Sequence, residues 1–219
     1  MTMRQPRDPS HSRGTQAFTL VELLVVMGVI SLLAAAVVTG FNEIGRARGV
    51  TEAAYQIASA VELCRSEAVS RQSYVWLGFQ PQTNAGSADL RLGMVYSMDG
   101  SSTNTNSTNL MPLGKALLIQ SVALAPVNTS IATNFSGVDL STVGAGMSFI
   151  IGTNKFTGPS ITFMPLGEVT TNPSPINTDG FDPILGFGLQ PTRGTTLLTN
   201  NLTELLIDGS VGIPTIIRP

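Results

Sequence analysis

The chain has 219 residues, of which 42% are hydrophobic and 12% are charged, and its formal net charge is -2. A chain with few charged residues and a slightly negative net charge offers no basic patch, so we predict no direct nucleic acid binding. The lone cysteine, Cys64, excludes an intramolecular disulfide, and the lone histidine, His11, lies near the amino terminus. The carboxylates, such as Asp139, Glu168 and Glu204, form no recognisable catalytic or ligand pattern. We therefore expect no enzymatic activity, no cofactor and no metal.

The first 17 residues are polar and carry Arg4, Arg7 and Arg13 against a single acid, Asp8. They precede an apolar run, residues 18–38, whose 21 residues would span about 31 Å as a helix, close to the thickness of a bilayer core. Because basic flanks remain cytoplasmic, we predict a single-pass inner-membrane segment with its amino terminus inside and the rest of the chain exported.

Glu22 is the only ionisable residue of the apolar run. A carboxylate in lipid costs free energy, so a retained Glu22 is a candidate functional residue. Two other interpretations remain open. An ordinary secretory signal could be cleaved after the small residues 34–36, and the run could be a plain anchor.

A basic leader, a small residue and then "FTLVELLVV", with an acid five residues after the junction, resemble the class III signal of type IV prepilins and type II secretion pseudopilins. The resemblance implies that a prepilin peptidase cleaves between Ala17 and Phe18 and that the new Phe18 amine is methylated. Glu22 would then pair with the Phe18 amine of a neighbouring subunit and set the register of assembly. These families usually have Gly where Ala17 stands.

The same resemblance implies the partners of the protein. They are the prepilin peptidase, other pilin or pseudopilin subunits, an inner-membrane assembly platform and a cytoplasmic assembly ATPase. After processing in the inner membrane, the subunit would enter a pilus or pseudopilus, with its head in the periplasm or outside the cell.

Residues 39–73 are predicted to continue the helix as an amphipathic segment. Apolar residues recur there at helical spacing: Val50, Ala54, Ile57, Val61, Cys64 and Ala68. This stripe is expected to pack on a globular domain. Gly40, Gly45 and Gly49 lie between the two halves, and we expect either a flexible joint or a loosely wound segment without a role.

The segment "LCRSEAVSRQSYVWLGFQP", residues 63–81, resembles the helix end and first strand of GspH/FimT minor pseudopilins. The matching residues are Arg65, Ser66, Glu67, Ala68 and Arg71, and the later "ITFMPLGEVT" echoes that group's Phe-x-Pro-x-Gly turn. The chain is similar in size to members of the Verru_Chthon cassette of prepilin-like proteins. The resemblance implies a minor subunit.

Residues 74–219 are predicted to form an antiparallel, β-rich head, which makes the whole fold α+β and pilin-like. Seven β-branched or aromatic runs indicate strands: 74–80, 90–98, 117–124, 147–151, 161–164, 185–190 and 203–217. Asp208 and Gly209 are expected at the turn of the last hairpin. Asp179 and Asp182 offer oxygen atoms for Ca²⁺ but have no defined ligand spacing.

Two alternative functions follow from the same residues. The head could be a membrane-displayed adhesin or ligand-binding module, in which case Tyr74, Trp76 and Tyr96 should be exposed beside the polar loops. Alternatively, the protein could be an anchored monomer that never enters a filament, for which Glu22 would have no role in assembly.

Overall fold

The computed structural model describes residues 19–84, 87–103, 109–130, 132, 135–175, 180–198 and 201–218. The side chains of residues 34–48 are outside that description, as are the predicted leader, Ala17 and Phe18. The chain divides into two compact units, residues 1–43 and 44–219, which are described separately. The fold is α+β, with a long amino-terminal helix and a β-rich, largely antiparallel head, as the sequence predicts.

Helix α1 extends from Leu20 to Arg71, and its backbone is helical through Gly40, Gly45 and Gly49. It ends in a Schellman motif. The Ser73 N–H donates to the Ala68 carbonyl (3.1 Å) and the Gln72 N–H donates to the Val69 carbonyl (3.3 Å). Gln72 has a φ of 51° there, so the left-handed position is filled without glycine.

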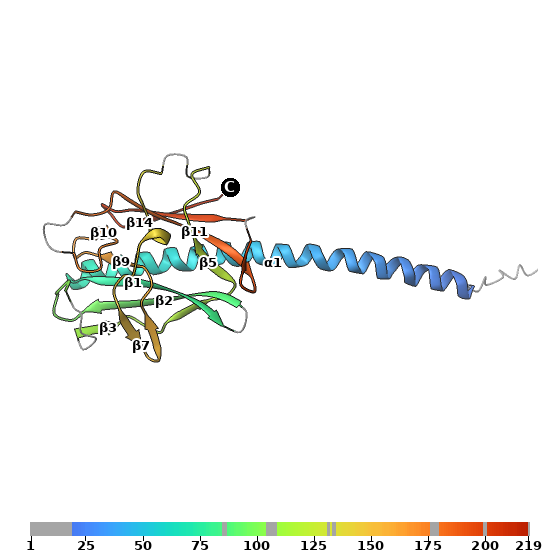
Figure 1. The fold of residues 1–219 in the computed structure, drawn as a ribbon, viewed down its shortest axis with the longest axis horizontal. Coiled ribbons are helices and arrows are strands. Elements are labelled where there is room, and N and C mark those ends of the chain that lie inside the picture. The colour runs from blue at the N-terminus through green and yellow to red at the C-terminus, as the bar shows by residue number, and fades with distance from the viewer. Residues whose placement is uncertain are drawn as a thin grey trace, which may run out of the picture. The chain divides into compact units, whose positions relative to one another are not determined.

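The C-terminal part of α1 packs against the head through the predicted apolar stripe. All six residues of that stripe are at most 1% exposed: Val50, Ala54, Ile57, Val61, Cys64 and Ala68. They form one core with side chains from both large sheets, so α1 is the common partner of both (Figure 1). Phe79 and Phe187 join the two sheets within this core, with ring centroids 5.3 Å apart.

The first sheet has the order β10-β9-β1-β2-β3, and β4 also pairs with β2. Its strands are β1 (Val75–Asn84), β2 (Ser87–Ser97), β3 (Leu110–Pro112), β4 (Leu117–Ile119), β9 (Ser160–Phe163) and β10 (Val169–Thr170). All pairings in this sheet are antiparallel. Alternation along β1 directs Val75, Leu77 and Phe79 to the helix side and Trp76 to the opposite face.

The second sheet has the order β12-β11-β13-β14, and both β5 and β6 also pair with β11. Its strands are β5 (Val122–Ala125), β6 (Val138–Asp139), β11 (Ile184–Arg193), β12 (Thr196–Leu197), β13 (Thr203–Asp208) and β14 (Ile213–Ile217). The β6–β11 pairing is parallel, which is an exception to the predicted antiparallel arrangement. A short 3₁₀ helix, Leu140–Thr142, follows β6.

A third, two-stranded sheet covers the face of the first sheet that points away from α1. It consists of β7 (Phe149–Ile151) and β8 (Asn154–Phe156). The rings of Phe149 and Phe156 stack with centroids 4.9 Å apart and lie over a cross-strand glycine pair, Gly78 and Gly93. A methyl group on Gly93 would approach Phe156 Cζ to 2.6 Å, so both glycines are needed for this close contact.

All seven predicted runs contain strand, although 117–124 divides into β4 and β5. The turn of the β13–β14 hairpin is longer than Asp208 and Gly209 alone, because Ile213 pairs with Asp208 and four residues lie between them. None of the short strands β3, β6, β8, β10 and β12 falls within a predicted run. Three of them, β6, β10 and β12, have only two residues, which is too short to show a period in sequence.

We predict that Gly93→Val weakens the head by about 1 to 3 kcal/mol, because its side chain would displace the Phe156 ring from the sheet. The matched control is Gly144→Val, since no atom lies within 4 Å of a Cβ at Gly144. Urea unfolding of the full chain in detergent measures both. Equal midpoints for the two variants would contradict the role given to the glycine pair.

We also predict that Cys64 resists alkylation in the folded protein. Burial, and secondarily the Glu67 carboxylate, raise the pKa of the Cys64 thiol, so little thiolate forms at neutral pH. Iodoacetamide labelling followed by mass spectrometry should modify Cys64 in urea and leave it unmodified in the native chain. Rapid native labelling would show that the helix and head separate readily.

Candidate functional site

The amino-terminal end of α1 carries the one predicted assembly residue that the structure describes, Glu22. The processing junction predicted at Ala17 and Phe18 lies outside the described residues. Glu22 is exposed in the first turn of the helix. Its position next to a helix amino terminus is favourable for a negative charge, because the helix dipole and free N–H groups are positive there.

Glu22 and Thr19 form a reciprocal capping box. The Glu22 N–H donates to Thr19 Oγ1 (3.2 Å), and Glu22 Oε2 accepts from the Thr19 N–H (3.3 Å) and from Thr19 Oγ1 (3.2 Å). The Thr-x-x-Glu spacing is a known helix-start signal. This local role of Glu22 differs from the predicted role toward a partner subunit, although the Thr-x-x-Glu spacing is present in the sequence.

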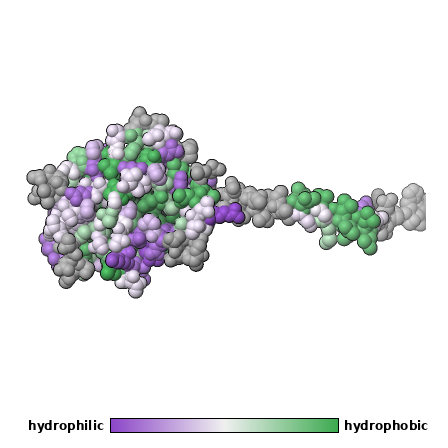
Figure 2. Space-filling view, viewed as in Figure 1, coloured by the Kyte–Doolittle hydropathy of each residue, from purple (hydrophilic) through white to green (hydrophobic). Residues whose placement is uncertain are grey.

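The first turns of α1, on both sides of Glu22 in the sequence, expose an apolar surface (Figure 2). Its eleven large side chains are between 52% and 79% exposed: Leu20, Val21, Leu23, Leu24, Val25, Val26, Met27, Val29, Ile30, Leu32 and Leu33. Such a surface calls for an apolar environment or a partner. Within the described residues, no helix meets the combined requirement of length and apolar character for crossing a bilayer.

The two segments that resemble GspH/FimT proteins meet at the C-terminal part of α1. Gly167, in the turn after β9, has a φ of +89°, and a methyl group there would lie 3.3 Å from Val69 Cγ2 and 3.6 Å from Arg65 Nε. Phe163 of the same segment is fully buried. Arg65 and Gly167 therefore belong to one contact between the helix and the head, which their positions in sequence did not show.

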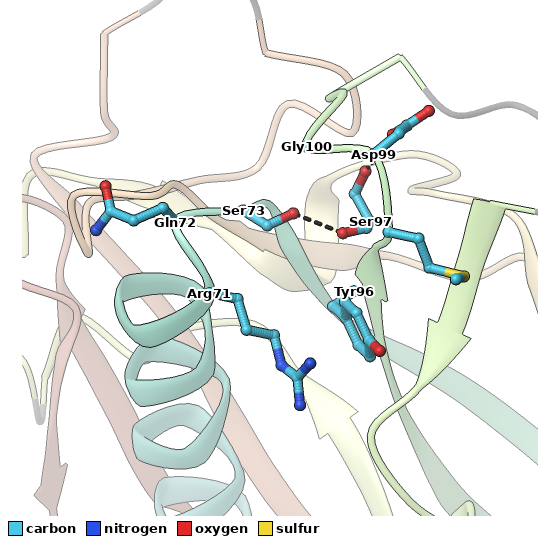
Figure 3. A pocket seen from close by; sticks show the side chains of 8 residues that line it. Arg71, Gln72, Ser73, Tyr96, Ser97, Asp99 and Gly100 are labelled. Carbon is cyan, nitrogen blue, oxygen red and sulfur yellow. Dashed lines mark hydrogen bonds between the residues drawn. The ribbon is translucent and has the colours of Figure 1, made fainter.

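A polar pocket lies at the end of α1, where the helix turns into β1 (Figure 3). Arg71 Nε donates to Glu67 Oε2 (2.5 Å), and its guanidinium lies 4.1 Å from the centroid of the Tyr96 ring. Ser73 Oγ donates to the Ser97 carbonyl (2.6 Å) at the back of the pocket. The Arg71–Tyr96 and Ser73–Ser97 contacts hold the helix end on β2, so these side chains of the pocket are engaged in structural contacts.

The three aromatic residues that an adhesin head was expected to expose are packed within the head. Trp76 is fully buried and its Nε1 donates to the Pro173 carbonyl (2.9 Å). Tyr74 is 8% exposed, and Tyr96 is half-buried under Arg71. None of the three forms an exposed aromatic patch beside a polar loop.

The structure brings together two carboxylates that the sequence analysis treated as scattered. Asp139 Oδ2 accepts from the Val127 N–H (2.8 Å), and Glu204 Oε1 accepts from the neighbouring Asn128 N–H (2.5 Å). Burial raises the pKa of Glu204, the Asn128 N–H opposes this, and the Asp139 carboxylate raises that pKa further. Glu168, in a different turn, is not part of this pair.

No three His, Cys, Asp or Glu side chains are grouped as a metal site in the part of the chain that the structure describes. Asp182, considered above for Ca²⁺, instead holds a loop. Its Oδ2 accepts from the Thr171 N–H (2.6 Å) and from Thr171 Oγ1 (2.9 Å). Asp179 lies outside the described residues.

Comparison with known proteins gives one match, and it covers the amino-terminal segment. Residues 12–38 match the model of the prokaryotic N-terminal methylation motif, a range that includes Ala17, Phe18 and Glu22. No curated protein and no solved structure matches the chain. The chain therefore carries a prokaryotic N-terminal methylation motif, consistent with a type IV prepilin-like class III signal, at the start of a long helix that leads into a β-rich head.

Proposed function

We propose that the protein is a minor pilin or pseudopilin that is cleaved between Ala17 and Phe18, methylated on Phe18 and assembled into a type IV pilus-like or type II secretion filament. The observation that carries this proposal is the match of residues 12–38 to the methylation motif, together with an exposed carboxylate at Glu22. Its function would be structural assembly rather than catalysis.

The exposed apolar turns from Leu20 to Leu33 support two successive environments for this segment. Before assembly, lipid of the inner membrane would cover them, with the leader in the cytoplasm and the head in the periplasm. After assembly, the helices of neighbouring subunits would cover them. Both environments remove the apolar side chains from water, so the free energy gained by burying them is kept before and after assembly.

Glu22 would act through its charge in the filament. Cleavage after Ala17 would create a positive amine on Phe18, which directly precedes Thr19 and lies four positions before Glu22. In an apolar bundle, the carboxylate of one subunit and the amine of the next would be less costly together than apart, which favours a single register. The capping box adds a second role, because it holds the Glu22 side chain at the helix start.

The contact between Arg65 and the Gly167 turn supports assignment to the GspH/FimT kind, since the two resembling segments meet in space. The lack of a cysteine pair favours a minor over a main subunit. The partners would be the prepilin peptidase, other pilin-like subunits, the assembly platform and its ATPase.

Processing is tested by mass spectrometry of the amino-terminal peptide from membrane-extracted protein, with and without the prepilin peptidase. We expect a peptidase-dependent start at methylated Phe18, retention of this start in Ala17→Gly, and its loss in Ala17→Leu, whose larger side chain alters the junction. A start beyond residue 38 would indicate ordinary secretion. An uncleaved chain in peptidase-containing cells would indicate a plain anchor.

Assembly is tested by separating the charge of Glu22 from its capping role. Glu22→Gln keeps a side chain that can complete a capping box but removes the charge, whereas Thr19→Ala removes the cap and keeps the charge. We expect Glu22→Gln to reduce the sheared-filament fraction at least tenfold, and Thr19→Ala to reduce it less than threefold. These fold-changes are about 1.4 and 0.6 kcal/mol in an equilibrium.

Both variants should be cleaved and membrane-inserted to the same extent as the unmodified chain, which the amino-terminal peptide and membrane fractionation will show. Normal assembly of Glu22→Gln combined with failure of Thr19→Ala would mean that Glu22 serves only its own helix. Normal assembly of both would support an anchored monomer or a different assembly contact.

A further inference from the structure

Two carboxyl groups hold residues 126–128 on the face of the second sheet that points away from α1. Leu205, the neighbour of Glu204 on β13, belongs to the core beneath the sheet, so strand alternation directs Glu204 to the opposite face. Glu204 and Asp139 each accept a hydrogen bond from one backbone N–H of the segment. These two bonds join the segment to β13 and to the end of β6.

The two carboxyl groups differ in how their oxygen atoms are satisfied. Both oxygens of Asp139 are engaged, because Oδ1 accepts from the Ser141 N–H (2.9 Å) and Oδ2 accepts from the Val127 N–H (2.8 Å). Glu204 is 0% exposed, and its buried Oε2 has no hydrogen-bond partner among the described residues. An ionised Oε2 would therefore be a charge shielded from solvent, without a donor and near a second carboxylate, whereas a proton on Glu204 removes that charge.

No cation faces Glu204 in the part of the chain that the structure describes. The residues directly opposite it on the neighbouring strands carry no charge: Gly188 on β11 and Ile217 on β14. Residues 126–128 are also uncharged, so Asp139 is the titratable group beside Glu204. Three further charged residues of these strands lie elsewhere: Arg193 and Asp208 at strand ends, and Arg218, whose guanidinium is 5.5 Å from the ring centroid of Tyr55 on α1.

We propose that Glu204 is a pH-sensitive latch of the head. When Glu204 is protonated, residues 126–128 are closed on the second sheet. When Glu204 is ionised, repulsion from Asp139 and the burial of Oε2 favour release of the Asn128 N–H, so that the segment opens and water reaches the carboxylate. The latch acts within the head and is independent of cleavage after Ala17 and of assembly through Glu22.

The direction of the pH dependence follows from the surroundings of Glu204. Burial has the largest effect on the pKa of Glu204 and raises it, the bond from the Asn128 N–H lowers it, and the Asp139 carboxylate raises it. The folded head therefore holds the Glu204 proton more tightly than the unfolded chain does. The stabilisation from this proton is fully present below the ordinary pKa of a glutamic acid and is lost as the pH rises through the raised pKa.

Stability is tested by thermal unfolding of the full chain in a nonionic detergent, followed by circular dichroism. Glu204→Gln keeps an acceptor for the Asn128 N–H and cannot ionise, and comparing it with the unmodified chain at each pH cancels the titration of other groups. We expect the two midpoints to agree within about 1 °C at about pH 4, and the variant to unfold about 2 to 4 °C higher at about pH 8. The matched control, Glu168→Gln, removes a carboxylate elsewhere in the head and should retain the pH dependence of the unmodified chain.

Hydrogen exchange shows where the effect acts. The readout is the protection of the Val127 and Asn128 amides, corrected for intrinsic exchange at each pH. The internal reference is the Thr171 amide, which donates to Asp182 in another loop of the head. Between about pH 4 and about pH 8 we expect protection at Val127 and Asn128, relative to Thr171, to fall at least about threefold in the unmodified chain and to remain constant in Glu204→Gln.

Two results would overturn the latch. A midpoint difference between Glu204→Gln and the unmodified chain that is the same at acidic and alkaline pH would show that titration of Glu204 is not linked to folding. A pH-dependent difference with unchanged protection at Val127 and Asn128 would show that the ionisation of Glu204 acts on the head as a whole and not on this segment.

Discussion

The buried face of the C-terminal part of α1 is the constraint on which the head depends. Both large sheets contribute side chains to the core that this face completes, and neither could bury its inner face without the helix. Small residues such as Ala54, Cys64 and Ala68 alternate with the larger Ile57, which lets the helix lie close to two sheets. Once this face is placed, the outer features follow: the Schellman turn at Gln72 leads directly into β1, and Arg71 fastens the helix end to Tyr96.

Each sheet is closed on its second face in a different way. The first sheet uses an aromatic hairpin, in which Phe149 and Phe156 rest on the glycines of β1 and β2. The second sheet uses an irregular stretch of chain, held by Asp139 and Glu204 through backbone N–H groups. The first closure is therefore made by apolar packing, and the second by hydrogen bonds from backbone N–H groups to carboxyl oxygens.

Glu22 has a capping role within its own helix and a proposed role in the contact between subunits. In the single chain it completes a capping box with Thr19, which is a sufficient reason for an acid at that position of a helix. The assembly proposed above would give a second reason, because a processed neighbour would present a positive amine to the same carboxylate. The two roles are compatible, since a capped side chain is already oriented when a partner arrives.

The sequence by itself determined the features that depend on near neighbours in the chain. The apolar run, the methylation signal, the 3.6-residue stripe from Val50 to Ala68 and the α+β class were all readable, because periodicity and short motifs are local properties. The Thr19–Glu22 cap was equally local and was overlooked. Only the tertiary structure decided the parallel β6–β11 pairing, the burial of Trp76 and the meeting of Asp139 with Glu204. These depend on which strands lie side by side, and residues 65 positions apart carry no sequence pattern that records their distance in space.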